Sequence, residues 1–574
     1  MNMKKLTFPL IILLSLLLNS NSLFLINKAA TIDSSVIIVP DDYPSIQLAI
    51  NEAKEYSTII VKEGEYAEKI VINKPLKILG VGNKSVIIGE DDSHIVEISR
   101  VSNVIFANFQ IKGTRKKGWA GIYVSQSSNV SIFNVSITNC FRGIYIWDSV
   151  RCTLRNVTMT GNDYSFEVWG LPLQHFVHDI DMSNRIDGRP ICYIINKRNL
   201  EVPADAAYVA IVNSTSIIAK NLHITNNGQG LLMAYSTNCS VKDSTFARNV
   251  LGVHVILSRN ITVSKNDIIQ NENYGLLMVA SSMNNISHNI FKKNYAGITL
   301  SYSSLISEHS NENLLTYNLI KENNYGIVFL SANNNIVVNN IIEDNVYGIT
   351  IQRSCENLIF NNNFLENTYQ VTSDLSENMW DSGYFCGGNY WSNYDGDDVF
   401  HGPYQNITGS DGIIDHPYII NENNIDRYPL LRPLDICISI ITVSVRFEPK
   451  ILNLRSGSRV LTAYIALPEE FSIKEVIIPS ITLNDTVTAE PNSIDVKGYN
   501  GDSVSNLIVN FDMRKVAAKI FSSMDLEKLR EEEFVVFVKL ALKGKLCNGI
   551  YFYGIAPIKV VMPDPGGLYN IAML

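Results

Sequence analysis

Three carboxylates accompany a row of aromatic residues in the first half of the chain. Asp148 follows Trp147, Glu167 lies two residues before Trp169, and Asp179 comes shortly afterwards. Cleavage of a glycosidic bond usually needs two carboxyl groups, about 5–5.5 Å apart for retention or about 6.5–9.5 Å apart for inversion. Neighbouring strands are about 4.8 Å apart, so residues on stacked coils can satisfy either geometry. The pattern makes Glu167 a candidate general acid, with Asp148 or Asp179 as base or nucleophile.

The aromatic residues themselves favour a different chemistry, the stacking of side chains on sugar rings. The candidate carbohydrate-binding residues are Tyr123, Tyr145, Trp147, Trp169 and His178. Binding alone needs no acid–base pair, whereas a lyase would also need a basic group such as Arg151 or Arg189. The alternative is that both tryptophans pack beneath an insertion.

Two further groups could bind metal ions. The candidate cation ligands are Asp395, Asp397, Asp411 and Asp415, whose hard oxygens suit Ca²⁺. The EF-hand spacing is absent, so solvated acidic turns are the alternative. Copper would need clustered His, Met or Cys, and only His175 and His178 are close neighbours among the histidines. The alternative is that His175 and His178 are ordinary polar residues of a loop and bind no metal.

A repeat must position all of these residues. A glycine followed by alternating apolar residues recurs mostly 22 residues apart, at Gly121, Gly143, Gly230, Gly252, Gly275, Gly297, Gly326 and Gly348. The first and third residues after each glycine are apolar throughout and should face the interior. Met233 and Met278 belong to that set, so we expect core residues there. Such a period indicates a stacked array, and the helical periodicity of a leucine-rich horseshoe is missing.

Polar residues, mostly asparagine, also recur in pairs five residues apart, as in Asn103/Asn108, Asn284/Asn289 and Asn335/Asn340. Asparagine tolerates left-handed backbone angles in turns, and stacked asparagines can hydrogen-bond along a ladder. These features predict an all-β fold, a right-handed parallel β-helix with about 22 residues per coil.

The chain divides into several predicted parts. Residues 1–30 are typical of a secretion signal, residues 31–433 of the β-helix, and residues 434–574 of a small antiparallel β-sandwich. A helix over residues 44–56 should cap the exposed first coil. Residues 170–207 are an insertion and residues 370–433 close the array. We expect the insertion or the sandwich to cover the outward apolar stripe formed by Leu232, Leu277, Val279, Val328 and Leu330.

The signal predicts a secreted or cell-surface protein, with an uncleaved N-terminal anchor as the alternative. Ten N-x-S/T sequons fit such a glycoprotein, although a chain rich in Asn, Ser and Thr also produces them by chance. Cys437 and Cys547 could form a disulfide. The net charge of −9 argues against a nucleic-acid partner.

The repeat, the insert HDIDMSNRIDGRPICYIINK and the closing motifs GGNYWSNYDGDD, DGIIDHPYII and DRYPL together resemble NosD-like β-helix proteins of the carbohydrate-binding and sugar-hydrolase (CASH) group, which are similar to pectate lyases in fold. The resemblance covers roughly residues 36–433. The C-terminal region resembles a β-sandwich of archaeal surface proteins. The NosD name implies periplasmic copper handling and nitrous-oxide reductase maturation.

The functional expectation is therefore a secreted or cell-surface module that binds a polysaccharide or surface glycan, with envelope or surface-layer partners. The alternatives are a CASH-type polysaccharide hydrolase or lyase and a NosD-like copper-binding protein.

Overall fold

The computed structural model describes residues 35–561, except for 90–92, 114, 304, 306, 385–386, 435, 437–440, 454–459, 469–470, 472, 474–475, 485, 491–494, 499–504, 523–534 and 547–550. The predicted secretion signal and the predicted Cys437–Cys547 disulfide lie outside the described residues.

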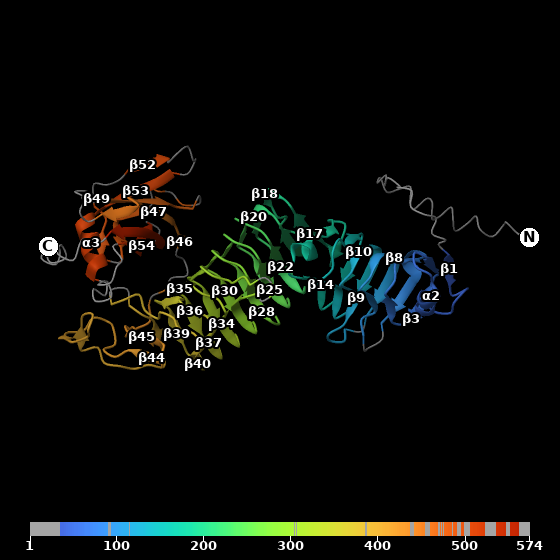
Figure 1. Ribbon diagram of the computed structural model, residues 1–574, viewed down its shortest axis with the longest axis horizontal. Helices are drawn as coiled ribbons and strands as arrows, with labels where there is room; N and C mark the ends of the chain where they lie inside the picture. Colours follow the sequence, from blue (N-terminus) through green and yellow to red (C-terminus); the bar gives the residue numbers. More distant parts are fainter. Residues whose placement is uncertain are drawn as a thin grey trace, which may run out of the picture.

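The expected parallel β-helix is confirmed, as a solenoid of about 15 turns with ~22 residues per coil. Figure 1 shows its coils running from the blue N-terminal end to the yellow end, with the C-terminal sheets in orange and red. The strands that follow the repeat glycines form sheet one. In the N-terminal half its strands are β4 (Ile70–Ile72), β7 (Val96–Ser99), β9 (Ala120–Ser125), β11 (Arg142–Trp147) and β14 (Tyr164–Trp169).

A second run of parallel strands takes the place of sheet one in the C-terminal half, although no strand pairing joins β14 to β17, and we include it under the same name. Its strands are β17 (Arg189–Ile195), β19 (Tyr208–Val212), β22 (Gln229–Ala234), β25 (Leu251–Ile256), β28 (Tyr274–Val279), β31 (Ala296–Ser301), β34 (Tyr325–Leu330), β37 (Tyr347–Gln352) and β40 (Tyr369–Asp374). Each strand pairs in parallel with the next. The apolar positions predicted to face inward are buried, Met233 and Met278 included.

Sheets two and three complete each C-terminal coil. Sheet two holds β18 (Arg198–Glu201), β20 (Thr215–Lys220), β23 (Ser240–Lys242), β26 (Thr262–Ser264), β29 (Asn285–Ser287), β32 (Leu314–Thr316), β35 (Ile336–Val338) and β38 (Leu358–Phe360). Sheet three holds β21 (His223–Thr225), β24 (Thr245–Ala247), β27 (Asp267–Ile269), β30 (Ile290–Lys292), β33 (Leu319–Lys321), β36 (Ile341–Glu343), β39 (Asn363–Leu365) and β41 (Tyr390–Trp391).

In the N-terminal half, the places of sheets two and three are taken by one continuous sheet. Its two long strands, β8 (Ser102–Lys112) and β10 (Ser128–Thr138), run through the corner of the coil. The other strands of this sheet are β1 (Val36–Val39), β2 (Thr58–Val61), β3 (Gly64–Ala67), β5 (Lys77–Gly80), β6 (Ser85–Ile88), β12 (Thr153–Arg155), β13 (Thr158–Thr160), β15 (Asp179–Ile180) and β16 (Arg185–Ile186).

The first coil is covered by helix α2 (Ile46–Glu52), which is shorter than the predicted helix. Its side chains Ile46, Ala49 and Ile50 are fully buried in the solenoid core. Ser45 is its N-cap, accepting a hydrogen bond from the Leu48 N–H, so the preceding Pro44 lies outside the helix.

The repeat glycines are explained by the close approach of successive coils. A Cβ atom on Gly230 would lie 2.5 Å from the carbonyl oxygen of Gly252, and one on Gly252 would lie 2.5 Å from that of Gly275. No other residue type fits such a contact without moving backbone, because both atoms belong to hydrogen-bonded strands. The recurrence of glycine every coil therefore follows from the stacking itself.

The asparagine pairs occupy two different positions in the coil. Asn103, Asn129 and Asn238 lie exposed in left-handed turns, whereas Asn289, Asn318 and their equivalents are buried. Each buried amide donates to the next coil, as Asn289 Nδ2 does to Asn318 Oδ1 at 3.0 Å. A further buried ladder contains Asn249, Asn271, Asn294, Asn323, Asn345 and Asn367.

The insertion builds part of the solenoid instead of forming a simple loop. A 3₁₀ turn, η2 (Leu173–Phe176), precedes β15 and β16, which extend the sheet of β12 and β13. The insertion also covers part of the outward apolar stripe, as expected. Leu232 is fully buried and belongs to one core cluster with Phe176 of the insertion.

The closing segment covers the last coil with aromatic side chains. Trp391 stacks between Phe364 and Tyr418, with ring centroids 4.2 Å from each, and Trp380 packs beside it. The short strands here are β42 (Phe400–His401), β43 (Ile407–Thr408), β44 (Tyr418–Asn421) and β45 (Asn424–Asp426). Thus both ends of the apolar interior are covered, as solenoids require.

The C-terminal region contains two mainly antiparallel sheets that share one apolar core. One holds β46 (Ile441–Thr442), β48 (Ile451–Asn453), β50 (Val476–Leu483), β51 (Val487–Thr488), β54 (Val535–Leu546) and β55 (Tyr551–Val561). The other holds β47 (Ser444–Glu448), β49 (Val460–Ala466), β52 (Asp495–Gly498) and β53 (Ser505–Asp512), followed by helix α3 (Met513–Ser522).

Candidate functional site

The outward side of sheet one in the N-terminal half aligns most of the residues singled out in the sequence. Tyr123, Tyr145 and Glu167 are direct neighbours on β9, β11 and β14, and Trp147 lies beside Trp169. Before Tyr123, the same row contains Val71 on β4 and Glu97 on β7. The repeat therefore places these side chains in two parallel rows. Successive residues within each row come from successive coils.

Two residues from outside these rows extend the aromatic surface. The His94 ring stacks on Tyr123 with centroids 4.3 Å apart, and Trp119 meets His94 edge-on at 5.0 Å. Tyr123 and Tyr145 follow at 5.3 Å. Trp119 and Trp147 are 38 % and 37 % exposed, so both indoles can reach a ligand in solvent. We call His94, Trp119, Tyr123, Tyr145 and Trp147 the aromatic face.

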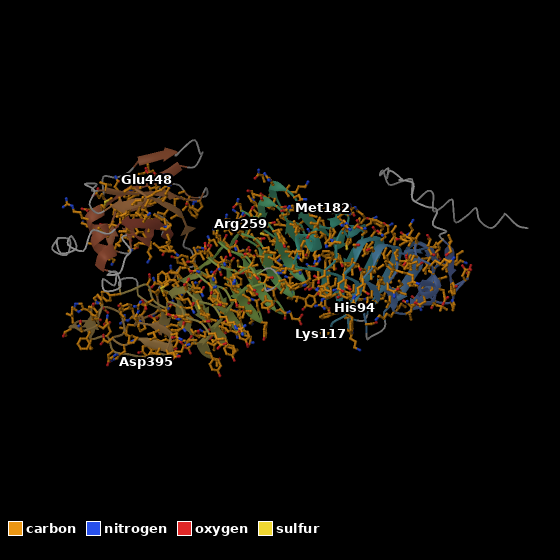
Figure 2. All side chains as sticks on the ribbon, viewed as in Figure 1. His94, Lys117, Met182, Arg259, Asp395 and Glu448 are labelled. Atoms are coloured by element: carbon orange, nitrogen blue, oxygen red, sulfur yellow. The ribbon has the colours of Figure 1, made fainter. Side chains whose placement is uncertain are left out.

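His94 is neutral on this face. Burial lowers its pKa to about 4, because the effect of burial exceeds the opposite effect of the nearby Glu97 carboxylate. The Ala120 N–H donates to His94 Nδ1 at 3.0 Å, which places the ring proton on Nε2. Figure 2 labels His94 and Lys117 along the same edge of the N-terminal coils.

The structure puts Glu167 inside the protein. Its side chain is 4 % exposed and pairs with Arg142, whose Nε lies 2.7 Å from Oε2. The other carboxylate oxygen accepts a hydrogen bond from the Trp169 indole at 2.5 Å. Gly228 covers the side chain so closely that a Cβ there would lie 2.3 Å from Glu167 Cγ. Both oxygens thus have partners, one on the preceding strand β11 and the other on β14 itself.

The other two candidate carboxylates lie apart. Asp148 faces His175 of the insertion, with Oδ1 and Nδ1 3.1 Å apart and both side chains partly exposed. Asp179 pairs with Arg155 at 2.5 Å on β15, in the sheet of β12 rather than in sheet one. Sequence spacing alone suggested one cluster, but the coil turns a corner between Asp148 and Asp179.

His178 and Trp169 are buried or covered. His178 accepts from the Cys152 N–H and donates to the His175 carbonyl, and burial lowers its pKa to about 4. It is therefore a neutral core histidine. The Trp169 ring packs on His254 at 5.0 Å and against the cluster that contains Leu277, so a later coil covers it rather than the insertion named in the alternative.

The acidic residues of the closing segment form turns at the far end of the solenoid, where Figure 2 labels Asp395. Asp415 accepts the N–H groups of Val399 and Phe400, and Asp411 accepts that of Ile413. Within the part of the chain that the structure describes, no three His, Cys, Asp or Glu residues form a group that could hold a metal ion. His175 and His178 also share no common ligand position, because His178 Nε2 is bonded to a carbonyl.

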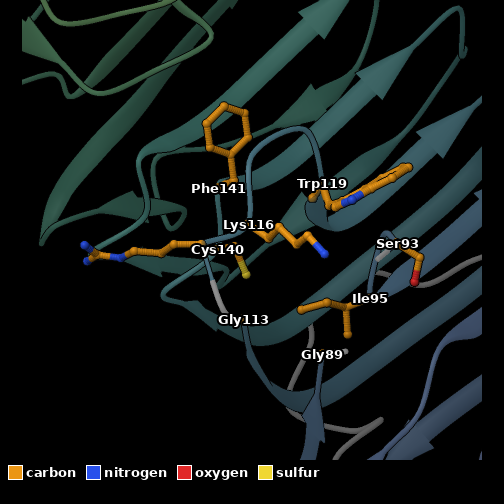
Figure 3. Close-up of a pocket in the computed structure, with 10 residues that line it drawn as sticks. Gly89, Ser93, Ile95, Gly113, Lys116, Trp119, Cys140 and Phe141 are labelled. Atoms are coloured by element: carbon orange, nitrogen blue, oxygen red, sulfur yellow. The ribbon is translucent and has the colours of Figure 1, made fainter. Parts of the chain in front are cut away.

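A small cavity of about 20 Å³ lies beside the aromatic face, under the segment that carries Trp119. Figure 3 shows Cys140, Phe141 and Trp119 around it. It has room for about one water molecule. Lys117 of the same segment pairs with Glu272 at 2.8 Å, so this segment is held to a coil of the C-terminal half.

The sequence-based search missed His94, Trp119 and Arg142, which lie outside the outward repeat positions. It also missed an edge of stacked tyrosines, in which the rings of Tyr325, Tyr347 and Tyr369 are 4.9 and 5.0 Å apart. The signal was present, because tyrosine precedes several repeat glycines in the pattern YG. No helix among the described residues is long and apolar enough to cross a membrane.

Comparison with solved structures gives parallel β-helix proteins at low similarity. The A-module of the mannuronan C-5 epimerase AlgE6 from Azotobacter vinelandii is 13 % identical, with 58 % of this chain and 94 % of that chain covered and a TM-score of 0.24. The alginate lyase from Paenibacillus sp. str. FPU-7 is 13 % identical, with coverages of 44 % and 94 % and a TM-score of 0.23. The periplasmic alginate epimerase AlgG is 14 % identical, with coverages of 59 % and 73 % and a TM-score of 0.27.

No curated protein matches the chain. A family model described as "Periplasmic copper-binding protein (NosD)" matches residues 183–331 and 301–396, which lie within the solenoid and its closing segment. The matched residues contain the buried asparagine ladders, the repeat glycines from Gly230 to Gly348 and part of the insertion. The solenoid of this chain is accordingly a NosD-like parallel β-helix.

Proposed function

We propose that this protein acts outside the cytoplasm as a carbohydrate-binding β-helix, and that the aromatic face holds a polysaccharide. The observation that carries the proposal is the contact between aromatic rings from successive coils, flanked by the exposed indoles of Trp119 and Trp147. Such rings present apolar faces to the C–H faces of sugars at little entropic cost, since they have few rotatable bonds.

Location outside the cytoplasm is supported by the periplasmic description of the matching family and by the secretion-like N-terminus. The straight stacking of coils supports a polymeric ligand, because equivalent side chains recur about every 4.8 Å along one line. Envelope or surface-layer partners remain predictions of the sequence.

Copper binding, which the family description names, is not supported by the donors described here. Met233 and Met278 are buried in the core, and His254 is buried on the outer side of sheet one beneath Trp169. Copper sites require several soft or imidazole donors around one point.

A glycan-array screen of the purified protein tests the proposal. We expect binding to polysaccharides that Trp119→Ala and Trp147→Ala each weaken at least tenfold. Tyr404→Ala is the matched control, because Tyr404 is 85 % exposed in the closing segment, away from the aromatic face. Unchanged binding in both tryptophan variants, or no binding to any glycan, would refute the proposed face.

A second candidate function, polysaccharide cleavage, is favoured by the Asp148–His175 pair. A carboxylate that orients an imidazole beside a ligand surface is a common acid–base arrangement. Asp148 lies directly after Trp147 and is partly exposed, unlike Glu167. Analysis of products from each bound glycan decides the point: new reducing or unsaturated ends that disappear in Asp148→Asn support cleavage, and intact ligand supports binding alone.

A further inference from the structure

A second surface feature lies on a different side of the N-terminal coils, independent of the aromatic face. A groove of about 420 Å³ is lined by Tyr56, Leu76, Lys77, Asn103, Ile105, Asn129 and Ser131. We call it the Tyr56 groove. Its volume falls within the range of about 300–1,000 Å³ that is typical of sites for small ligands.

Three coils supply the floor of the groove in register. Lys77 of β5, Ile105 of β8 and Ser131 of β10 are paired neighbours, so their side chains form a row across the outer face of this sheet. Asn103 and Asn129 border the row, and the Asn129 amide donates to Asn103 Oδ1 at 3.0 Å. These strands are rigid parts of the solenoid, which makes the polar groups well positioned before any ligand arrives.

Tyr56 borders this groove from a turn with left-handed backbone angles. Its φ is 64°, in the left-handed region, and its side chain is 40 % exposed. The Tyr56 N–H donates to the Pro75 carbonyl at 2.6 Å, which holds the turn in place. Left-handed corners recur at other tyrosines of the chain, such as Tyr235 and Tyr317, so the feature of Tyr56 that bears on a ligand is its exposed ring beside the groove.

The chemistry of the lining favours an acidic ligand. None of the seven lining residues is acidic, and Lys77 is exposed. Arg151 adds a second cation at the border, donating from Nε to Asn129 Oδ1 at 2.8 Å. These two cations lie on a chain with a net charge of −9, and the nearest acidic residue in sequence, Glu55, precedes Tyr56 outside the lining.

We propose that the Tyr56 groove binds a short acidic saccharide. The Tyr56 ring would pack on a sugar face, Lys77 would pair with its carboxylate, and Asn103 and Ser131 would bond its hydroxyl groups. A ring for stacking, a cation and several amide or hydroxyl groups form the combination that a uronic acid unit needs.

Binding of 4-linked digalacturonate, measured by titration calorimetry, tests this site, with the methyl-esterified disaccharide as the uncharged counterpart. We expect tighter binding of the acid, and loss of that preference in Lys77→Gln. Lys197→Gln, an exposed lysine beyond β17, is the matched control. Tyr56→Gly removes the ring and permits the backbone angle, so we expect at least tenfold weaker binding with no fall in Tm.

Several results would overturn the proposal. They are no binding of the acidic disaccharide at millimolar concentration, equal binding of the acid and its ester, or unchanged binding in both Tyr56→Gly and Lys77→Gln. Trp119→Ala separates the two sites, because it should weaken polysaccharide binding at the aromatic face and leave the disaccharide affinity unchanged. Loss of both in Trp119→Ala would show that one surface serves both ligands and would also overturn the Tyr56 groove.

Discussion

Arg142 and Glu167 form an ion pair between adjacent coils, with Arg142 Nε 2.7 Å from Glu167 Oε2 and the Glu167 side chain 4 % exposed. The guanidinium also lies 5.4 Å from the ring centroid of Tyr145. The ion pair therefore connects Tyr145 of the aromatic face with Glu167 on β14, which Gly228 of a later coil covers.

The first prediction concerns this ion pair. Glu167→Gln should lower the free energy of unfolding by about 3–5 kcal/mol, because it leaves the Arg142 charge largely buried without its partner. Asp179→Asn is the control, since the Asp179–Arg155 pair is exposed and should contribute less than about 1 kcal/mol. Urea denaturation of both variants measures the difference. Equal losses of stability in the two variants would show that burial does not determine how much the Arg142–Glu167 ion pair contributes to stability.

The second prediction concerns the repeat glycines. Gly252→Ala places a Cβ 2.5 Å from the Gly275 carbonyl oxygen and 2.7 Å from an Ile268 methyl group. Because these neighbours belong to packed coils, we expect a loss of about 1–3 kcal/mol in stability.

The control for that variant is Asn273→Ala, an exposed change in the turn before β28 that should stay within about 0.5 kcal/mol. Thermal unfolding followed by circular dichroism compares the two. A Gly252→Ala protein as stable as the wild type would mean that the coils separate easily at this contact.

The third prediction distinguishes the buried asparagine ladder from the exposed one. Asn318 Oδ1 accepts both the backbone N–H and the side-chain amide of Asn289, each at 3.0 Å. Asn318→Ala leaves these buried donors without an acceptor, so we expect a loss of at least about 2 kcal/mol.

Asn134→Gly removes an exposed ladder residue while still permitting its φ of 53°. Water can replace its hydrogen bonds, and we expect a loss below about 1 kcal/mol. Chemical denaturation of both variants provides the comparison. A larger loss in Asn134→Gly than in Asn318→Ala would contradict the proposed role of burial.

The fourth prediction concerns pH and the closing segment. Burial raises the pKa of Asp426 to about 7, against about 3.9 in an unfolded chain. The folded state therefore holds the proton more tightly, and the contribution of Asp426 to stability is full below about pH 4 and is lost as pH rises toward 7. Asp426 accepts hydrogen bonds from the Asn389 N–H and the Trp391 indole, so the effect acts on the cap of the last coil.

Calorimetric Tm values for the wild type and Asp426→Asn between pH 4 and pH 8 test this assignment. The difference between wild type and variant should fall as pH rises, because asparagine does not titrate. A difference that stays constant over this range would assign the titration to another group. Asp381 faces the same site, paired with Arg427, and is the first group to substitute in that event.

Much of the architecture follows from the sequence alone. Glycines about 22 residues apart and strict apolar alternation define the coil, because a parallel stack places equivalent residues at the same position in every turn. That periodicity also gave the register of Tyr123 with Tyr145 and of Trp147 with Trp169, which the strand pairing confirms. Local spacing was sufficient here because each contact joins neighbouring coils.

Only the tertiary structure decided which of these side chains reach solvent. Glu167 and Trp169 occupy outward positions in the repeat, yet Gly228 and His254 from later coils cover them. His94 and Trp119 lie outside the repeat positions, yet they join the aromatic face. Periodicity specifies the direction in which a side chain points from its own coil. The exposure of that side chain depends on insertions and turns that do not follow the period. Exposure is therefore decided only when segments distant in the sequence pack together.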